Sequence, residues 1–348
     1  MEYLYEYLTF LAQAITIVVA ILIIASAMFG ISQRNVDHEP IGRLRIDKVN
    51  DHLRSMRHAM EAAVLTDGQF KKQHKAEAKL QKKTNKSAPK EPQPSTNGRL
   101  FCLNFEGDIK ASGVDRLREE ITSILTLAQP TDEVLVAIES PGGMVSNYGL
   151  AASQLTRITD KNITLTVAVD KVAASGGYLM AVVADKIIAA PFALVGSIGV
   201  VAQVPNVHRL LKKNDVDVEV LTAGKHKRTL TTLGENTEEG RQKFQEELED
   251  VHSLFQEFVS RYRPAIEIDT VATGEAWYGS RAIDLGLVDT LATSDDYIVQ
   301  ACAERDVYTV RWDEIRKPFD RLMERVNGIA KQVEMTIAKF TASDKPLG

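Results

Sequence analysis

The feature that most constrains the fold is an alternation, from Arg99 onward, of short apolar runs with longer amphipathic segments. The apolar runs predict strands over 100–105, 133–138, 163–169 and 216–221. The amphipathic and buried helical patterns predict helices over 114–127, 145–158, 178–184 and 237–262. Strands that are joined through helices form a parallel sheet with helices on its faces. We therefore expect an α/β domain over residues 99–312.

Two glycine-rich turns follow predicted strands of this sheet. Ser140–Gly143 comes after the strand that ends near Glu139, and Ser175–Gly177 comes after the strand that ends at Val169. Ligands of parallel sheets bind beyond the carboxyl ends of the strands, and glycine lets a substrate backbone come close. We expect both turns at one sheet edge, with Ser175 as a candidate nucleophile. A tight turn with a capping serine is the simpler alternative.

A serine nucleophile needs a general base to take its proton and donors to receive the oxyanion. The globular part contains three histidines, none in a pattern that favours a Ser-His-Asp triad: His208, His226 and His252. The alternative base is a lysine that desolvation keeps uncharged. The segment 222–228 offers Lys225 and Lys227, although by itself it would be interpreted as a solvated basic loop.

The N-terminus begins with an uncharged run from Leu8 to Ile31 that is long enough to cross a bilayer as a helix. A cleaved leader would start with basic residues and have a shorter apolar core, whereas Glu2 and Glu6 precede this run. The small residues 25–27 leave a cleavage site as the alternative. We expect a membrane anchor over 1–32, and the basic residues that follow it favour a cytoplasmic C-terminal side.

A charged stalk or linker is expected over 33–98. Within it, the apolar spacing of Ile46–Leu65 is helical, and Lys71–Lys90 is rich in lysine. The lysines indicate either a solvated linker or a segment that binds anionic lipid. After the α/β domain, residues 313–348 predict an amphipathic helix and a tail.

The composition excludes several classes of protein. Basic residues number 42 and acidic residues 47, a balance unlike that of a nucleic-acid-binding protein. Cys102 and Cys302 are too far apart in sequence to indicate a metal motif or a disulfide framework. No His-Glu-x-x-His pattern occurs. We therefore expect neither a metal nor another cofactor.

Several motifs together carry a resemblance to a known family. They occur in a fixed order as Glu139–Gly143, Asp170–Tyr178, Ala184–Ile187, Val195–Val200, Ala223–Lys227 and Gly286–Asp289. With the N-terminal anchor and the lysine-rich stalk, they make the chain resemble the signal peptide peptidase A family of serine–lysine proteases, most closely its SohB branch. Each motif alone would be weak, but their order and spacing are specific.

The resemblance implies a ClpP/crotonase-like spiral of βαβ units behind an N-terminal transmembrane helix. It also assigns roles to five residues: Ser175 as nucleophile, Lys227 as general base, Ser197 as the residue that orients Lys227, and Gly143 and Gly176 as the oxyanion hole. Lys225 is the lesser candidate for the base. The implied reaction is endopeptidase cleavage of hydrophobic or signal-peptide-like peptides, without a cofactor.

The resemblance further implies a homo-oligomeric ring or bowl at the bacterial inner membrane. It suggests a periplasmic catalytic domain, whereas the charge pattern suggests a cytoplasmic one. Two other functions are compatible with such a core. One is a crotonase-like acyl-CoA enzyme, which would not need a nucleophilic serine or an anchor. The other is a membrane scaffold that has lost the chemistry, against which the presence of both Ser175 and Lys227 argues.

Overall fold

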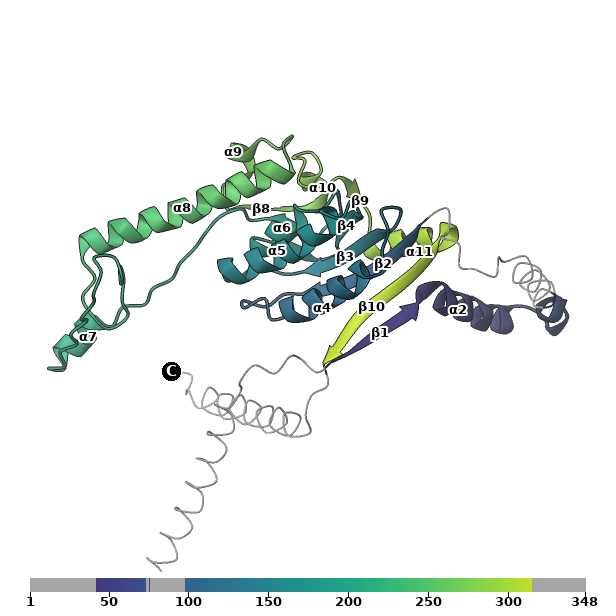
Figure 1. The fold of residues 1–348 in the computed structure, drawn as a ribbon, viewed down its shortest axis with the longest axis horizontal. Helices are drawn as coiled ribbons and strands as arrows, with labels where there is room; N and C mark the ends of the chain where they lie inside the picture. The colour runs from purple at the N-terminus through teal and green to yellow at the C-terminus, as the bar shows by residue number, and fades with distance from the viewer. Residues whose placement is uncertain (1–41, 73–74, 76–97, 315–348) are drawn as a thin grey trace, which may run out of the picture. The chain divides into compact units, whose positions relative to one another are not determined.

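A seven-stranded sheet forms the core of the described chain in the computed structural model, which describes residues 42–72, 75 and 98–314 (Figure 1). Its strand order is β1-β10-β2-β3-β4-β6-β9, and every pairing from β10 to β9 is parallel. The strands are β1 (Gly42–Lys48), β2 (Arg99–Glu106), β3 (Glu133–Glu139), β4 (Thr164–Val169), β6 (Lys186–Ala189), β9 (Thr290–Leu291) and β10 (Asp306–Glu314). The parallel sheet predicted from the alternating pattern is confirmed.

A second sheet of three short strands adjoins the carboxyl edge of the first. Its strands are β5 (Val172–Ala174), β7 (Leu194–Gly196) and β8 (Ala276–Tyr278). β5 runs parallel to β7, and β7 runs antiparallel to β8. A bridge between Ser140 and Ala173 joins the end of β3 to β5. The chain after β3 and the chain after β4 are thereby held together.

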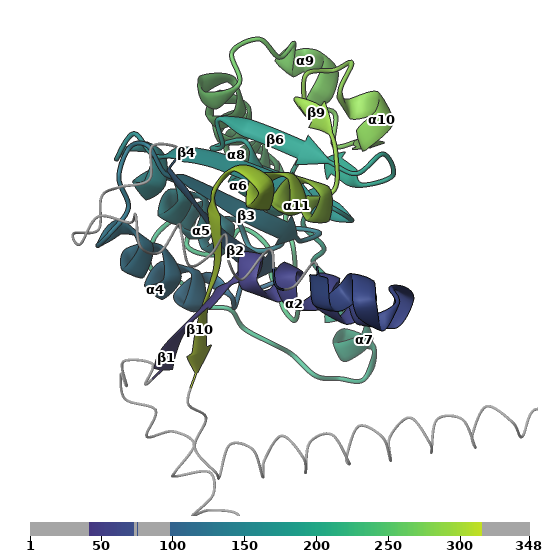
Figure 2. The ribbon, with the colours of Figure 1, turned by 90° about the vertical axis from the view of Figure 1, so that its right-hand side faces the viewer.

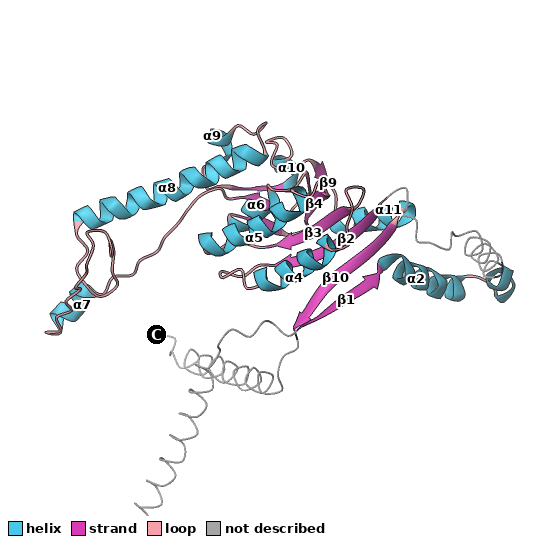
Figure 3. Cartoon of the chain, in the orientation of Figure 1, coloured by secondary structure: helices cyan, strands magenta, loops and turns pink. Residues whose placement is uncertain are grey.

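The helices lie between the strands in sequence, and Figure 3 shows helices in cyan and strands in magenta for the described chain. They are α2 (Val49–Val64), α4 (Val114–Leu125), α5 (Val145–Thr159), α6 (Gly176–Ala181), α7 (His208–Lys213), α8 (Glu238–Tyr262), α9 (Ile268–Val271), α10 (Gly279–Ala282) and α11 (Ser294–Glu304). The helices expected over 114–127, 145–158 and 237–262 are confirmed to within two residues at each end. The one expected over 178–184 begins two residues earlier, at Gly176.

Strand residues alternate between two cores on opposite faces of the large sheet. On one face Phe101, Val136 and Val167 pack with the buried residues of α4, α5 and α6. On the other face Cys102 and Leu135 pack with residues of α11. Figure 2 shows α4 and α5 neighbouring each other, with α11 on the other side of the sheet. Because α5 and α6 share the first core, the segments that precede them are held close together.

The start of α8 shows how local sequence sets a helix boundary. The Thr237 side chain accepts a hydrogen bond from the Gly240 N–H at 3.1 Å, as expected for an N-cap. Glu238 and Glu239 follow in the first turn, where acidic side chains favour the helix. Val259 of this helix is buried, and Phe255 and Phe258 pack against the core, whereas Leu254 is exposed.

The strand predicted over 216–221 differs from the structure. Residues 216–221 form no strand, and most of them are exposed. Their apolar/polar alternation suits a strand, but a strand also needs a hydrogen-bonding neighbour, and none pairs with them in the described chain. The helical spacing of Ile46–Leu65 is confirmed by α2, and the residues just before it form β1, an edge strand of the large sheet.

The expected anchor over 1–32 lies outside the described residues, as do most of Lys71–Lys90 and nearly all of 313–348. Among the helices that the structure describes, none is long and apolar enough to cross a membrane.

Glu120 is a buried carboxylate on α4 that predicts a pH dependence of stability. The residue is 2% exposed. Its Oε1 accepts a hydrogen bond from the backbone N–H of Trp312 at 2.8 Å, and its Oε2 has no partner among the described residues. Burial raises the pKa of Glu120 to about 7, although the Trp312 N–H and the charges of Arg116 and Arg311 lower it; Asp313 raises it further. Because the folded state holds the proton more tightly than the unfolded state, stability falls as pH rises from about 4.5 through 7.

We expect Glu120→Gln to remove this pH dependence. Between pH 5 and pH 8 the wild-type free energy of unfolding should fall by about 1 to 3 kcal/mol relative to the variant. Denaturant unfolding at several pH values measures this difference. Parallel pH profiles for the two proteins would show that Glu120 does not titrate in this range.

Candidate active site

The two glycine-rich turns meet at the carboxyl edge of the large sheet, as the sequence predicts. Ser140 donates its N–H to the Val172 carbonyl at 2.8 Å and accepts from the Ala174 N–H at 3.0 Å. A Cβ placed on Gly142 would lie 2.7 Å from the Gly176 nitrogen. The turn after β3 and the turn after β5 are therefore in direct contact.

Ser175 has a backbone conformation that side chains rarely adopt. Its φ is 49° and its ψ −118°, and it lies directly before α6. The Ser175 N–H donates to the Gly196 carbonyl at 2.8 Å, whereas the side chain makes no capping hydrogen bond. A strained conformation of this kind costs about 1 to 3 kcal/mol and is found mainly at functional sites. The geometry thus argues against a simple capping serine.

Two backbone donors flank Ser175 without partners. The N–H groups of Gly143 and Gly176 make no hydrogen bond to the described residues. Gly176 is buried against the Tyr148 ring, and a Cβ there would lie 2.4 Å from Tyr148 Cγ. Unpaired donors beside a serine are what an oxyanion hole requires, because the charge develops on the oxygen of the attacked carbonyl.

Ser197 lies close to Ser175 because β5 and β7 pair in parallel. Ala174 is the register partner of Gly196, so each serine follows a paired strand residue. Ser197 also has a positive φ, 52°. Its N–H donates to Glu275, and its hydroxyl is 3.4 Å from the Gly274 carbonyl oxygen. The structure therefore brings together four of the five predicted site residues.

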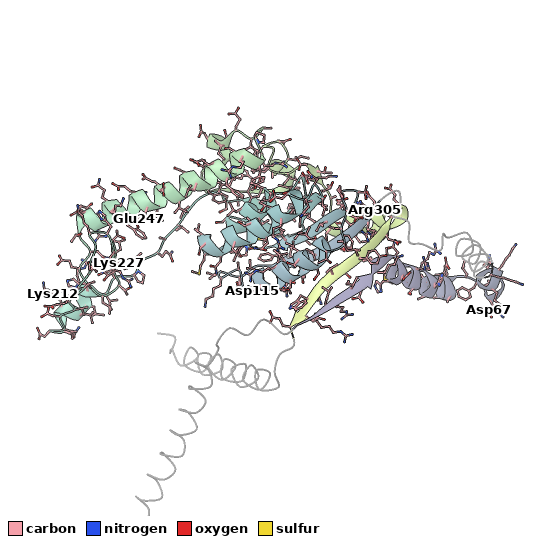
Figure 4. All side chains as sticks on the ribbon, viewed as in Figure 1. Asp67, Asp115, Lys212, Lys227, Glu247 and Arg305 are labelled. Atoms are coloured by element: carbon pink, nitrogen blue, oxygen red, sulfur yellow. The ribbon has the colours of Figure 1, made fainter. Side chains whose placement is uncertain are left out.

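Lys227 is the fifth predicted site residue, and within one chain it does not lie with the other four. It is exposed, and its N–H bonds to the Gly224 carbonyl at 3.2 Å. Figure 4 shows Lys227 near the N-terminal end of α8, away from the place that α6 occupies in the same view of Figure 1. Lys225 forms an ion pair with Glu239 at 2.9 Å, and this hydrogen bond lowers the pKa of Glu239. Lys225 and Lys227 therefore both lie on the same exposed segment.

Sequence reasoning missed two buried hydroxyls beneath the first turn. Ser140 and Tyr148 are both 0% exposed, and their oxygens are 2.6 Å apart. The Ser140 Oγ also accepts the Gly142 N–H at 3.1 Å. The only signal in the sequence was a tyrosine in the first turn of the helix that follows a Gly-Gly turn. Within the described residues, no group of His, Cys, Asp or Glu side chains is arranged to hold a metal ion.

Comparison with known families accounts for nearly all of the chain. The model of the peptidase family S49 N-terminal domain matches residues 2–155, and that of peptidase family S49 matches residues 157–308. The chain belongs to peptidase family S49. The probable protease SohB of Haemophilus influenzae is 50% identical over 326 residues, which cover 90% of this chain and 91% of that protein. The putative protease SohB of Buchnera aphidicola is 41% identical and covers 94% and 97%.

The S49 relatives identify this protein as a SohB-like peptidase, and the resemblance stated from the motifs is confirmed. Among solved structures, a membrane-bound stomatin-specific protease in complex with a substrate peptide shows 12% identity and a TM-score of 0.40, covering 67% of this chain and 99% of that chain. The fold of this S49 peptidase is a mixed α/β fold.

Substitution of Gly142 in this S49 peptidase is expected to cause a large loss of activity. Gly142 has φ +89°, and a Cβ would lie 2.8 Å from the Ser175 Cβ. Gly142→Ala should displace one turn from the other and lower turnover of a fluorogenic peptide by about 100-fold or more. Gly149→Ala is the matched control, because a Cβ at Gly149 on α5 meets nothing within 4 Å. Equal turnover by the two variants would contradict the assignment of this turn to the site.

Proposed function

We propose that this peptidase is a membrane-anchored serine endopeptidase in which Ser175 is the nucleophile. The observation that supports this most directly is the strained Ser175 in contact with the Gly142 turn, where the N–H groups of Gly143 and Gly176 have no partner among the described residues. The Ser175 Oγ would attack the carbonyl carbon of the scissile bond. The negative charge that develops on the carbonyl oxygen would be received by the two N–H donors.

We propose Lys227 as the general base, supplied by a neighbouring copy of the chain. A base must approach the Ser175 hydroxyl to within hydrogen-bond distance, and the lysine of the same chain lies elsewhere. An exposed lysine on an exposed segment is accessible to a second copy. In the resulting site, the Ser197 hydroxyl would accept a hydrogen bond from the lysine amine and direct its lone pair to Ser175. This arrangement makes a homo-oligomer, such as a ring or bowl, necessary for activity.

The proposed substrates are hydrophobic, signal-peptide-like peptides and membrane-associated proteins. Three large apolar side chains surround the Gly143 turn and are exposed: Ile109 (71%), Met144 (49%) and Val145 (53%). The Met144 N–H donates to the Ile109 carbonyl at 2.8 Å, so the two segments that carry them are held together. Exposed apolar side chains beside a proposed oxyanion hole suit an apolar peptide. The uncharged run Leu8–Ile31 would anchor the protein in the inner membrane.

The proposal is tested with the full-length protein in detergent. A hydrophobic, signal-peptide-like peptide and a polar peptide of equal length are incubated with it from pH 6 to pH 10, and cleavage is followed by mass spectrometry. We expect preferential cleavage of the hydrophobic peptide at a rate that rises with pH through one ionisation, because only an uncharged amine accepts the serine proton. A scaffold without catalytic activity would cleave neither peptide at any pH.

A further inference from the structure

A single tyrosine on α5 contacts both turns of the proposed site. Tyr148 lies in the first turn of the helix and is 0% exposed. Its hydroxyl is hydrogen-bonded to the Ser140 hydroxyl beneath the Gly142 turn, and its ring packs against Gly176, next to the proposed nucleophile. The ring also makes an edge contact with Phe105, with centroids 6.4 Å apart. Tyr148 is therefore part of the core and part of the wall beneath the site.

The hydroxyl groups form a chain with one consistent direction of donation. The Tyr148 hydroxyl donates to the Asp108 carbonyl at 2.7 Å. Because a tyrosine has one hydroxyl proton, Ser140 must donate its own proton to the Tyr148 Oη, 2.6 Å away. The Ser140 Oγ then accepts the Gly142 N–H at 3.1 Å. This chain holds the Gly142 N–H toward the protein interior.

The same chain of hydroxyl groups connects the Gly142 turn to a second loop, which contains Asp108. The Asp108 carboxylate accepts the Lys110 and Ser112 N–H groups at 3.1 and 2.8 Å, which orders the loop that provides the carbonyl acceptor. Burial raises the pKa of Tyr148 above its ordinary value. The tyrosine is consequently harder to ionise than an exposed tyrosine, which favours the donor role of its hydroxyl.

We infer that Tyr148, acting through Ser140, is a positioning residue for the oxyanion hole. The inference rests on the proposed function of Ser175, Gly143 and Gly176. The hydroxyl chain orients the turn that carries the Gly143 donor, and the Tyr148 ring sets the position of the Gly176 donor. Small displacements of such donors weaken the binding of the transition state more than the binding of the substrate, because the oxyanion exists only in the transition state and the intermediates.

Tyr148→Phe and Ser140→Ala test the inference in the full-length protein. Each variant breaks the hydroxyl chain, and Tyr148→Phe keeps the ring against Gly176. For a hydrophobic peptide substrate, we expect kcat to fall about 10-fold while KM stays within about 2-fold of the wild-type value. A peptide aldehyde, which binds serine peptidases as a tetrahedral adduct, should lose affinity by about the same factor as kcat.

Tyr178→Phe is the matched control. Tyr178 is also 0% exposed, and its hydroxyl donates to the Leu287 carbonyl at 2.9 Å, outside the hydroxyl chain. Its removal should lower the melting temperature about as much as Tyr148→Phe, without changing kcat or aldehyde affinity. If Tyr148→Phe and Ser140→Ala show wild-type kcat and aldehyde affinity, or a change in KM alone, the inference is wrong. If one of these two variants does not fold, the kcat and aldehyde affinity of the other variant decide whether the inference holds.

Failure of the proposed function has a different signature. Ser175→Ala is assayed beside the other variants with the same peptide. If it cleaves as fast as the wild type, the nucleophile assignment is wrong and the inference fails with it. If Ser175→Ala is inactive while Tyr148→Phe and Ser140→Ala behave as wild type, only the positioning role of Tyr148 is rejected.

Discussion

Ser175→Ala is expected to abolish peptide hydrolysis, with a fall in kcat of at least about 10⁴-fold. The substitution removes the hydroxyl that would attack the substrate carbonyl, beside the turn that carries the proposed N–H donor of Gly143 and directly before the donor of Gly176. The N–H donors remain, so peptide binding should change little. Turnover and KM of a fluorogenic hydrophobic peptide measure the effect in the full-length protein.

The control for Ser175→Ala is Ser153→Ala on α5. The Ser153 hydroxyl donates to the Gly149 carbonyl within the same helix at 2.8 Å, on the exposed surface. Its loss should leave both turnover and KM at the wild-type values. Hydrolysis by Ser175→Ala at more than about a hundredth of the wild-type rate would contradict the role of Ser175 as nucleophile.

Lys227→Ala should have the second largest effect, a fall in kcat of about 10³-fold, because no other group would take the Ser175 proton. Lys225→Ala is its matched control. The Lys225 ion pair with Glu239 is exposed on both sides and contributes little to stability. We therefore expect near wild-type turnover from Lys225→Ala. The reverse result would make Lys225 the base.

Co-expression of two inactive variants tests whether the base comes from another copy. If each site combines Ser175 of one chain with Lys227 of its neighbour, random mixing of Ser175→Ala and Lys227→Ala chains leaves about a quarter of the sites intact. Wild-type chains mixed with the double variant should also show about a quarter of full activity. If both residues come from one chain, the first mixture is inactive and the second keeps about half.

The fold could be predicted where one local pattern determined both the element and its packing. The β3 and β4 segments are mostly apolar, and their central residues are buried on both faces of the sheet. The stripe of α4 matches its buried residues Leu117, Ile121 and Ile124. The edge strand β1 could not be predicted. It reads Gly-Arg-Leu-Arg-Ile-Asp-Lys and becomes a strand through its neighbour β10, which lies more than 250 positions away in sequence.

The site could be predicted in part for a related reason. Glycine and serine in the turns after two strands indicated one sheet edge, which the contacts between Gly142 and Gly176 confirm. The positive φ of Ser175 and the Tyr148–Ser140 hydroxyl pair were not predictable, because both depend on contacts between separate segments. The roles of Lys227 and Ser197 remain predictions, and they concern contacts that a single chain does not make.

The most direct measurement is the site of covalent labelling by a fluorophosphonate. The full-length protein in detergent is incubated with the reagent, whose phosphorus bonds to a nucleophilic serine oxygen as fluoride leaves, and the digested protein is analysed by mass spectrometry. We predict a single adduct on Ser175, formed at the same rate as activity is lost, and much slower labelling in Lys227→Ala. Loss of activity with Ser175 unmodified, or with the adduct on another residue, would contradict it.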